Sequence, residues 1–174
     1  EVDRLTARVD EVLAAARERV MPSPRPFDPE DLLLDLVEEW GPRFEEVGVK
    51  FHADLATTEP VNGDRSAMRD AVACLLDNAL KFTPEGGDVR VVTGFLEDGS
   101  AYVVVRDTGP GMTEEEIMRA FYGGVPAGPR QGGGHGMGLP MVRHLAEAMG
   151  ASVDVESAPG RGTVVLIAFA HPGL

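Results

Sequence analysis

A carboxylate and two glycines in residues 107–111, Asp-Thr-Gly-Pro-Gly, have the types and spacing of a nucleotide-binding turn. The segment directly follows an alternating apolar run at residues 101–105, and this alternation predicts a strand. Asp107 is therefore expected at a strand end, where a buried carboxylate can accept a hydrogen bond from the amino group of a purine. Gly109 and Gly111 permit positive φ and a close approach of the backbone.

Two further segments carry groups that suit phosphates and a cation. Residues 132–139, Gly-Gly-Gly-His-Gly-Met-Gly-Leu, run into a helical pattern, and the free backbone donors of a helix N-terminus bind phosphate. Asn78 supplies an amide oxygen suited to a divalent cation. Lys81, three positions later on the same helix face, supplies an ammonium suited to phosphate. The chain has no Gly-x-x-x-x-Gly-Lys-Ser/Thr loop, so the three segments together predict a nucleotide site of another geometry.

Length and composition limit the class of protein. The 174 residues give room for one domain and a short appendage, and 43% hydrophobic residues can build a core. A formal net charge of −13 argues against nonspecific nucleic-acid or acidic-membrane binding. No apolar run approaches the roughly 18 residues of a membrane span, so we expect no membrane contact by this chain. The single cysteine, Cys74, excludes an internal disulfide and favours a cytoplasmic location, although a parent protein could still be membrane-anchored.

The first twenty residues have apolar positions three and four apart, which predicts a helix. An amphipathic arm and a truncated two-stranded coiled coil fit this pattern equally well. Three prolines in residues 22–26 then form a stiff linker. We therefore divide the chain into a helical arm with its linker, residues 1–26, and a domain, residues 27–174.

Within the domain, helical and alternating patterns predict an α+β fold. An Asp28-Pro29 cap opens a helix that Gly41-Pro42 should interrupt, and Asp64 caps a second helix that carries Asn78 and Lys81. The predicted strands cover residues 47–53, 89–95, 101–105, 153–155 and 165–167, and a third helix covers residues 139–149. The glycine- and proline-rich segment 123–138 should be a mobile lid. This order favours a two-layer α/β sandwich with a mixed, mainly antiparallel sheet.

Five ordered motifs resemble those of the ATP-binding catalytic domain of sensor histidine kinases. They are similar to the N box (Leu-Asp-Asn-Ala-Leu-Lys-Phe-Thr-Pro, residues 76–84), the G1 box (residues 107–111), the F box (Phe121-Tyr122), the G2 box (residues 134–139) and the final Gly-Arg-Gly-Thr turn (residues 160–163). The resemblance covers roughly residues 27–170. It implies the Bergerat fold that histidine kinases share with gyrase, Hsp90 and the mismatch-repair ATPases (the GHKL superfamily).

By this resemblance the nucleotide is ATP with Mg²⁺, with Asn78 as the metal ligand and Lys81 as a phosphate contact. Asp107 and the glycines bind adenine, and Thr163 helps to close the adenine pocket. The resemblance assigns further nucleotide contacts to Phe82, Gly109, Gly111, Gly134, Gly136, Met137, Gly138 and Leu139. Arg130 joins Asn78 and Lys81 in the catalytic set.

By this resemblance, residues 1–26 are the end of the dimerisation and phosphotransfer helix with its proline-rich linker. The resemblance also implies partners outside the chain. The γ-phosphoryl group would go to a histidine in a separate helical hairpin, of the same or a partner protomer, because no histidine here lies in the helical setting that the family requires. Those that fail the pattern are His52, His135, His144 and His171. A response regulator would receive the phosphoryl group next, and the full-length protein is expected to be a homodimer.

Two departures from the family pattern keep rival functions open. Cys74 stands one helical turn before Asn78, where the family usually has another Asn and gyrase-like ATPases a Glu; a small core residue is the simpler interpretation of Cys74. Gly123 stands where many members have an Arg, which leaves Arg130 as the only lid cation. The alternatives are a degenerate nucleotide-binding signalling module and a serine kinase of the anti-sigma-factor type. Gyrase-like hydrolysis is disfavoured because Cys74 is not Glu.

Overall fold

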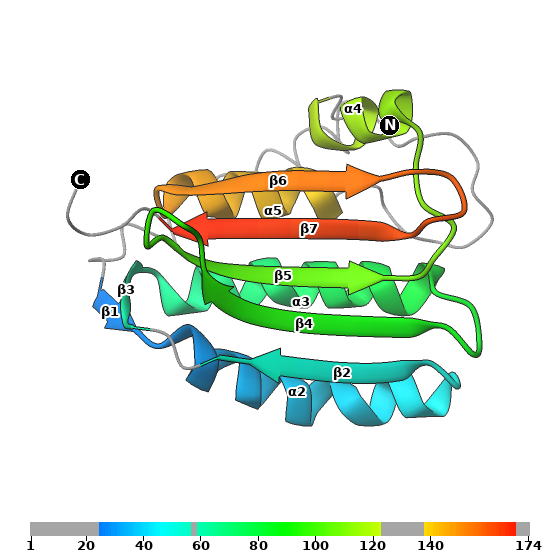
Figure 1. Ribbon diagram of the computed structural model, residues 1–174, viewed down its shortest axis with the longest axis horizontal. Coiled ribbons are helices and arrows are strands. Elements are labelled where there is room, and N and C mark those ends of the chain that lie inside the picture. The colour runs from blue at the N-terminus through cyan, green and yellow to red at the C-terminus, as the bar shows by residue number, and fades with distance from the viewer. Residues whose placement is uncertain (1–24, 57–58, 123–137, 170–174) are drawn as a thin grey trace, which may run out of the picture.

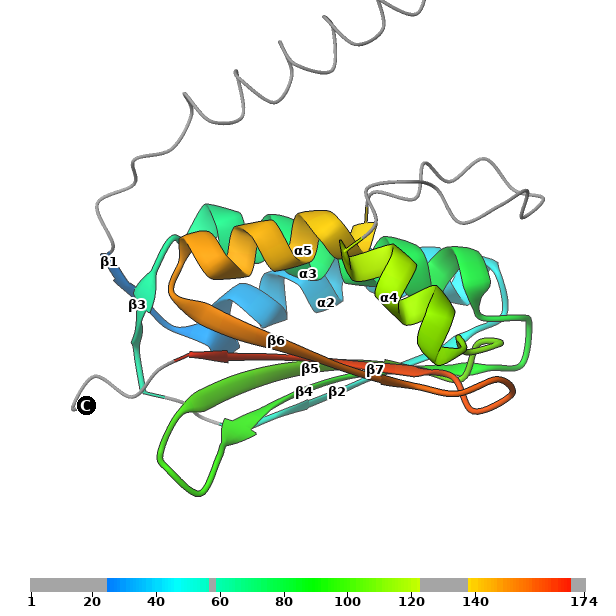
Figure 2. The same ribbon diagram turned by 90° about the horizontal axis from the view of Figure 1, so that it is seen from above.

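The chain forms a five-stranded sheet covered by helices on one face, as seen in a computed structural model that describes residues 25–56, 59–122 and 138–169 (Figures 1 and 2). Along the chain the elements are β1 (Arg25–Phe27), α2 (Pro29–Glu46), β2 (Lys50–Leu55), β3 (Val61–Gly63), α3 (Arg65–Phe82), β4 (Asp88–Phe95), β5 (Ala101–Asp107), α4 (Glu114–Tyr122), α5 (Gly138–Ala148), β6 (Ala151–Ser157) and β7 (Thr163–Phe169). The predicted two-layer α+β sandwich is confirmed. No helix in the described ranges has the length and hydropathy to cross a membrane.

The sheet has the order β2-β4-β5-β7-β6, in which β2 and β4 are parallel and every other pair is antiparallel. Helices α2, α3 and α5 lie side by side on one face of the sheet (Figures 1 and 2). Buried apolar side chains of both layers form one core cluster. In the β5–β7 register, Asp107 is the partner of Thr163. Two residues that are distant in the sequence thus reach one end of the sheet together.

Helix α3 follows its sequence signals closely. Asp64 caps it by accepting hydrogen bonds from the backbone N–H groups of Ser66 (2.8 Å) and Ala67 (3.2 Å). Its buried residues include the predicted stripe, namely Met68, Ala71, Val72, Leu75, Leu76 and Ala79. The helix ends at Phe82, which places Asn78 and Lys81 in its last two turns.

Helix α2 differs from its prediction, because it runs through Gly41-Pro42 and ends at Glu46. Trp40 and Phe44, on either side of this pair, are 5% and 0% exposed. Phe44 stacks on Phe51 of β2 with ring centroids 4.6 Å apart. Burial of two aromatic side chains in the core outweighs the hydrogen bond that a proline removes and the low helix propensity of glycine. The predicted interruption is therefore wrong.

A small antiparallel sheet of β1 and β3, at one end of the sandwich, has no counterpart among the sequence predictions (Figure 1). Phe27 of β1 and Val61 of β3 are buried, and the Phe27 ring meets Phe169 of β7 edge-on at 6.0 Å. Strand β1 thus packs against the sandwich. The boundary near residue 26 and the helical arm remain predictions, because residues 1–24 lie outside the described part of the chain.

Candidate nucleotide-binding site

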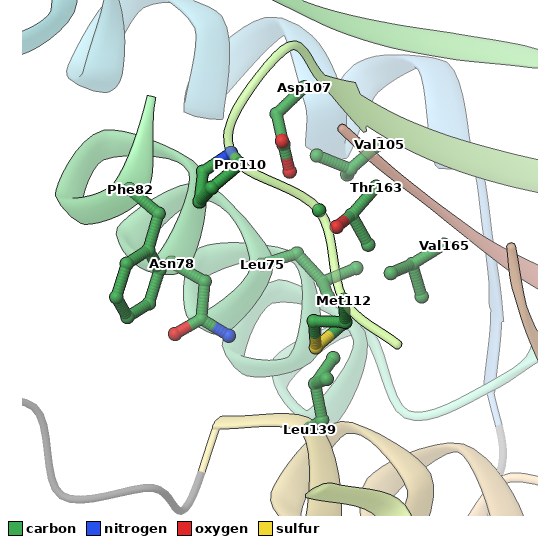
Figure 3. A pocket seen from close by; sticks show the side chains of 11 residues that line it. Leu75, Asn78, Phe82, Val105, Asp107, Pro110, Met112, Leu139, Thr163 and Val165 are labelled. Atoms are coloured by element: carbon green, nitrogen blue, oxygen red, sulfur yellow. The ribbon is translucent and has the colours of Figure 1, made fainter. Parts of the chain in front are cut away.

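A pocket of about 90 Å³ opens between the ends of α3, β5, β7 and α5 (Figure 3). Its lining combines polar side chains from three elements with an apolar wall. The lining residues are Leu75, Asn78, Phe82, Val105, Asp107, Pro110, Gly111, Met112, Leu139, Thr163 and Val165. Two predicted motifs, the turn at residues 107–111 and the end of α3, therefore meet at one cavity.

Asp107 is half-buried at the end of β5, and its carboxylate Oδ1 accepts a hydrogen bond from the backbone N–H of Gly109 at 2.8 Å. Burial raises the pKa of this carboxyl above its ordinary value, while hydrogen bonds from the backbone N–H groups of Gly109 and Thr163 partly offset the rise. The ionised group is thus incompletely compensated by the protein. A hydrogen-bond donor on a ligand would compensate it further.

Gly111 marks a close crossing between the loop after β5 and the turn that joins β6 to β7. Its φ is +70°, and a Cβ there would lie 1.9 Å from the carbonyl oxygen of Ala158. Beside it, the backbone N–H of Gly160 donates to the carbonyl oxygen of Pro110 at 2.7 Å. Only glycine fits this crossing, which holds the Asp107 loop against β7 and shapes one edge of the pocket.

The N-terminus of α5 lies directly against Asn78 of α3. A Cβ on Gly138 would lie 2.5 Å from Nδ2 and 2.9 Å from Oδ1 of the Asn78 side chain. The absence of a side chain at Gly138 therefore lets the first turn of α5 approach the amide. Leu139, the next residue, lines the pocket floor (Figure 3).

Lys81 follows Asn78 by three residues on α3 and is not one of the pocket-lining residues. Its Nζ is 2.5 Å from Oδ2 of Asp77, one turn earlier on α3, and both side chains are about 45% exposed. An exposed pair of this kind contributes at most about 1 kcal/mol, so the ammonium can exchange this partner for a phosphate at little cost.

The structure brings together six of the predicted nucleotide contacts: Asn78, Phe82, Asp107, Gly111, Leu139 and Thr163. Gly109 and Gly138 adjoin these residues without lining the pocket. Residues 123–137 lie outside the described part of the chain. They contain the predicted lid except for Gly138, the Gly123 departure, and the remaining predicted contacts, which are Arg130, Gly134, Gly136 and Met137.

Sequence reasoning missed the apolar wall of the pocket, formed by Leu75, Val105, Pro110, Met112 and Val165. A signal existed for two of them. Val105 and Val165 stand two positions from Asp107 and Thr163, and residues two apart in a strand share a face. Finding them required the β5–β7 register, which the sequence pattern does not state.

Cys74 packs against the hydrophobic core, and its side chain is partly buried. Burial raises the pKa of its thiol, and the neighbouring carboxylates of Asp70 and Asp77 raise it further. A neutral thiol is a poor metal ligand. The interpretation of Cys74 as a small core residue agrees with this placement.

The two described histidines lie away from the pocket lining. His52 on β2 has its Nε2 3.0 Å from Oδ2 of Asp88, and His144 is exposed on α5. His135 and His171 lie outside the described residues.

Comparison with known proteins gives a consistent family. A family model described as histidine kinase-, DNA gyrase B- and HSP90-like ATPase matches residues 63–172. The chain is 35% identical over 134 residues to the adaptive-response sensory kinase SasA of Synechococcus sp. (strain JA-3-3Ab), covering 76% of this chain and 36% of that protein. It is 38% identical over 123 residues to the histidine protein kinase DivJ of Caulobacter vibrioides, covering 69% of this chain and 20% of that protein.

Solved structures agree with this result. Full-length ShkA in complex with AMPPNP matches with a TM-score of 0.75 and 31% identity, covering 99% of this chain and 38% of that chain. The mycobacterial sensor histidine kinase MprB matches with a TM-score of 0.69 and 27% identity, covering 84% of this chain and 96% of that chain.

The chain belongs to the family of histidine kinase-, DNA gyrase B- and HSP90-like ATPases, with histidine kinases as its relatives, and ATP is its nucleotide. The serine-kinase, degenerate-module and gyrase-like alternatives are not favoured. The chain spans well under two thirds of either curated relative.

Proposed function

We propose that this chain transfers the γ-phosphoryl group of Mg²⁺-ATP to a histidine in a helical hairpin outside residues 1–174, and that a response regulator then receives the group. The observation that carries the proposal is the placement of Asp107 and Asn78 in one pocket, with an acceptor at one side and an amide at the other (Figure 3). Asp107 would accept a hydrogen bond from the adenine amino group, and Asn78 would lie toward the phosphates.

The residues present fit a phosphate-bound Mg²⁺ and not a metal held by protein groups alone. No cluster of three His, Cys, Asp or Glu side chains that could hold a metal occurs in residues 25–56, 59–122 and 138–169. Mg²⁺ is commonly held by one or two protein oxygens together with substrate phosphates and water. The Asn78 amide oxygen supplies one such ligand. When bound, the ion would neutralise phosphate charge during transfer.

Residues of this chain would position the phosphates of the nucleotide. Lys81 would leave Asp77 for a phosphate oxygen, and the first turn of α5 beside Asn78 would donate backbone N–H groups to phosphate. Arg130 would contact the γ-phosphoryl group, in place of the arginine that Gly123 replaces. We further propose a homodimeric full-length protein and a cytoplasmic location, the latter supported by free Cys74.

The direct test is phosphorylation of a hairpin supplied as a separate polypeptide. With radiolabelled ATP and Mg²⁺, acid-labile label should appear on the hairpin of the full-length protein and not on this chain alone. Label on His52, His135, His144 or His171 in the isolated chain would contradict an external acceptor. Acid-stable label on the partner would instead indicate serine phosphorylation.

Nucleotide binding should weaken on acidification at a pH above the ordinary aspartate range. Because the pKa of Asp107 is raised, the carboxyl is fully ionised only above this raised value. The ionised carboxylate offers only acceptor sites to the adenine amino group, whereas the protonated form carries a hydrogen on one of its oxygens. ADP should therefore bind with its full affinity at pH values above the raised pKa of Asp107, and this affinity should be lost as the pH falls through that pKa.

Titration calorimetry with ADP, carried out from neutral pH downward toward the ordinary aspartate pKa, measures this effect. The Asp107→Asn variant is the control, because the phosphates of ADP titrate equally in both experiments. Its pH profile should lack the Asp107 component. Superimposable profiles for the two proteins would contradict the assignment.

A further inference from the structure

The hydroxyl of Ser157, the last residue of β6, joins three parts of the pocket edge. Its Oγ accepts a hydrogen bond from the backbone N–H of Met112 at 2.8 Å and donates one to the carbonyl oxygen of Gly162 at 2.8 Å. The Oγ1 of Thr163 lies 2.9 Å from the same Ser157 oxygen. Met112 and Thr163 line the pocket, whereas Ser157 is not one of its lining residues.

The number of hydrogens available fixes the direction of the contact between the two hydroxyls. A serine hydroxyl has one hydrogen and two lone pairs. The carbonyl of Gly162 has no hydrogen, so the hydrogen of Ser157 must lie between these two oxygens. The hydrogen between Ser157 and Thr163 must therefore come from Thr163. Ser157 is then saturated, and Thr163 Oγ1 has only lone pairs left to offer.

This polarity matters because Thr163 is the register partner of Asp107, and both side chains line the same cavity (Figure 3). An ionised carboxylate also only accepts hydrogen bonds. The polar edge that these two residues form therefore consists of acceptors and needs donors from a ligand or from a water molecule bridging to it.

We propose that Ser157 is a positioning residue that holds Thr163 as an acceptor, so that the pocket selects a purine with an amino group over one with a carbonyl oxygen at the same place. The inference rests on the proposed contact of Asp107 with adenine. An amino group offers hydrogens to the two acceptors. A carbonyl oxygen would face them with none, and buried polar groups left without partners discriminate strongly against a ligand.

The test compares ADP with inosine diphosphate, which has a carbonyl oxygen where ADP has its amino group and, in every variant alike, a hydrogen on the neighbouring ring nitrogen. Calorimetry gives the ratio of the two dissociation constants for the parent chain, Ser157→Ala, Thr163→Val and the double variant. Ser157→Ala should lower the preference for ADP by about tenfold, because the released hydrogen of Thr163 can then donate to the inosine oxygen. In the Thr163→Val background, Ser157→Ala should leave the preference unchanged.

Ser152→Ala is the matched control, since Ser152 is exposed on the same strand and lies outside the pocket. It should keep the parent ratio. Thr163→Ser, which retains the hydroxyl, should also keep it, whereas Thr163→Val should lower it. If Ser157→Ala does not fold, these two variants decide: an unchanged ratio in Thr163→Val overturns the inference.

Two results in folded Ser157→Ala would also overturn it. Equal weakening of ADP and inosine diphosphate would mean that Ser157 only supports the loop. A changed ratio that persists in the Thr163→Val background would mean that selection does not pass through Thr163. An Asp107→Asn variant that binds ADP as well as the parent contradicts the proposed function and this inference together, whereas the two results above contradict the inference alone.

Discussion

Replacing Asn78 with alanine is expected to reduce phosphoryl transfer to a supplied histidine hairpin by about 100-fold or more, while ADP binding without Mg²⁺ changes little. The reason is that an oxygen ligand of a phosphate-bound cation acts where charge develops in the transition state, and removal of one such group costs several kcal/mol. Because Gly138 lies against the Asn78 side chain, the smaller alanine causes no new clash there.

Initial rates of label transfer at increasing Mg²⁺ concentrations measure the effect. The variant should need more Mg²⁺ for half-maximal transfer as well as being slower. Asn62→Ala is the matched control, because Asn62 is exposed on β3 and lies outside the pocket lining. Full transfer by Asn78→Ala at the parent's Mg²⁺ requirement would remove Asn78 from the metal site.

Sequence signals predicted the fold wherever a local pattern and the tertiary contact agree. The Asp64 cap and the apolar stripe of α3 needed no knowledge of the rest of the chain, and alternation located β4, β5 and β7. Pro42 failed as a helix terminator because Trp40 and Phe44 are buried in the core, and a local rule does not include tertiary packing. Strand β3, three residues long, is too short to show a period.

The residues of the site also divide into those that a local sequence pattern predicted and those that depend on tertiary contacts. Asp107 and Asn78 were found because glycine turns and an amide on a helix carry chemical signals of their own. Met112 and Ser157 were missed because their roles follow from the crossing of the loop after β5 with the β6–β7 turn, which depends on strand register. An ordinary methionine or serine has no local feature that marks it for this position.

Asp107→Asn should have two effects of opposite sign. ADP affinity should fall by about 10- to 100-fold, because the loss of a charge-assisted hydrogen bond costs roughly 1.5–3 kcal/mol. The ligand-free protein should become more stable at neutral pH. Burial raises the pKa of the carboxyl in the folded state above its pKa in the unfolded state, so protonation of Asp107 stabilises the fold. This stabilisation is fully present below the unfolded-state pKa and is lost as the pH rises through the folded-state pKa, so the parent protein lacks it at neutral pH. Asparagine stays neutral at every pH and can still accept the Gly109 hydrogen bond.

Calorimetry with ADP and thermal denaturation without ligand measure the two effects on the same samples. Asp154→Asn, an identical change at an exposed position of β6, is the matched control and should alter neither affinity nor the neutral-pH melting temperature appreciably. An Asp107→Asn protein that binds ADP like the parent would remove Asp107 from adenine recognition. A protein that binds weakly and also melts earlier would show that the carboxylate supports the fold, because a group kept for ligand binding at the expense of stability must give opposite signs in the two experiments.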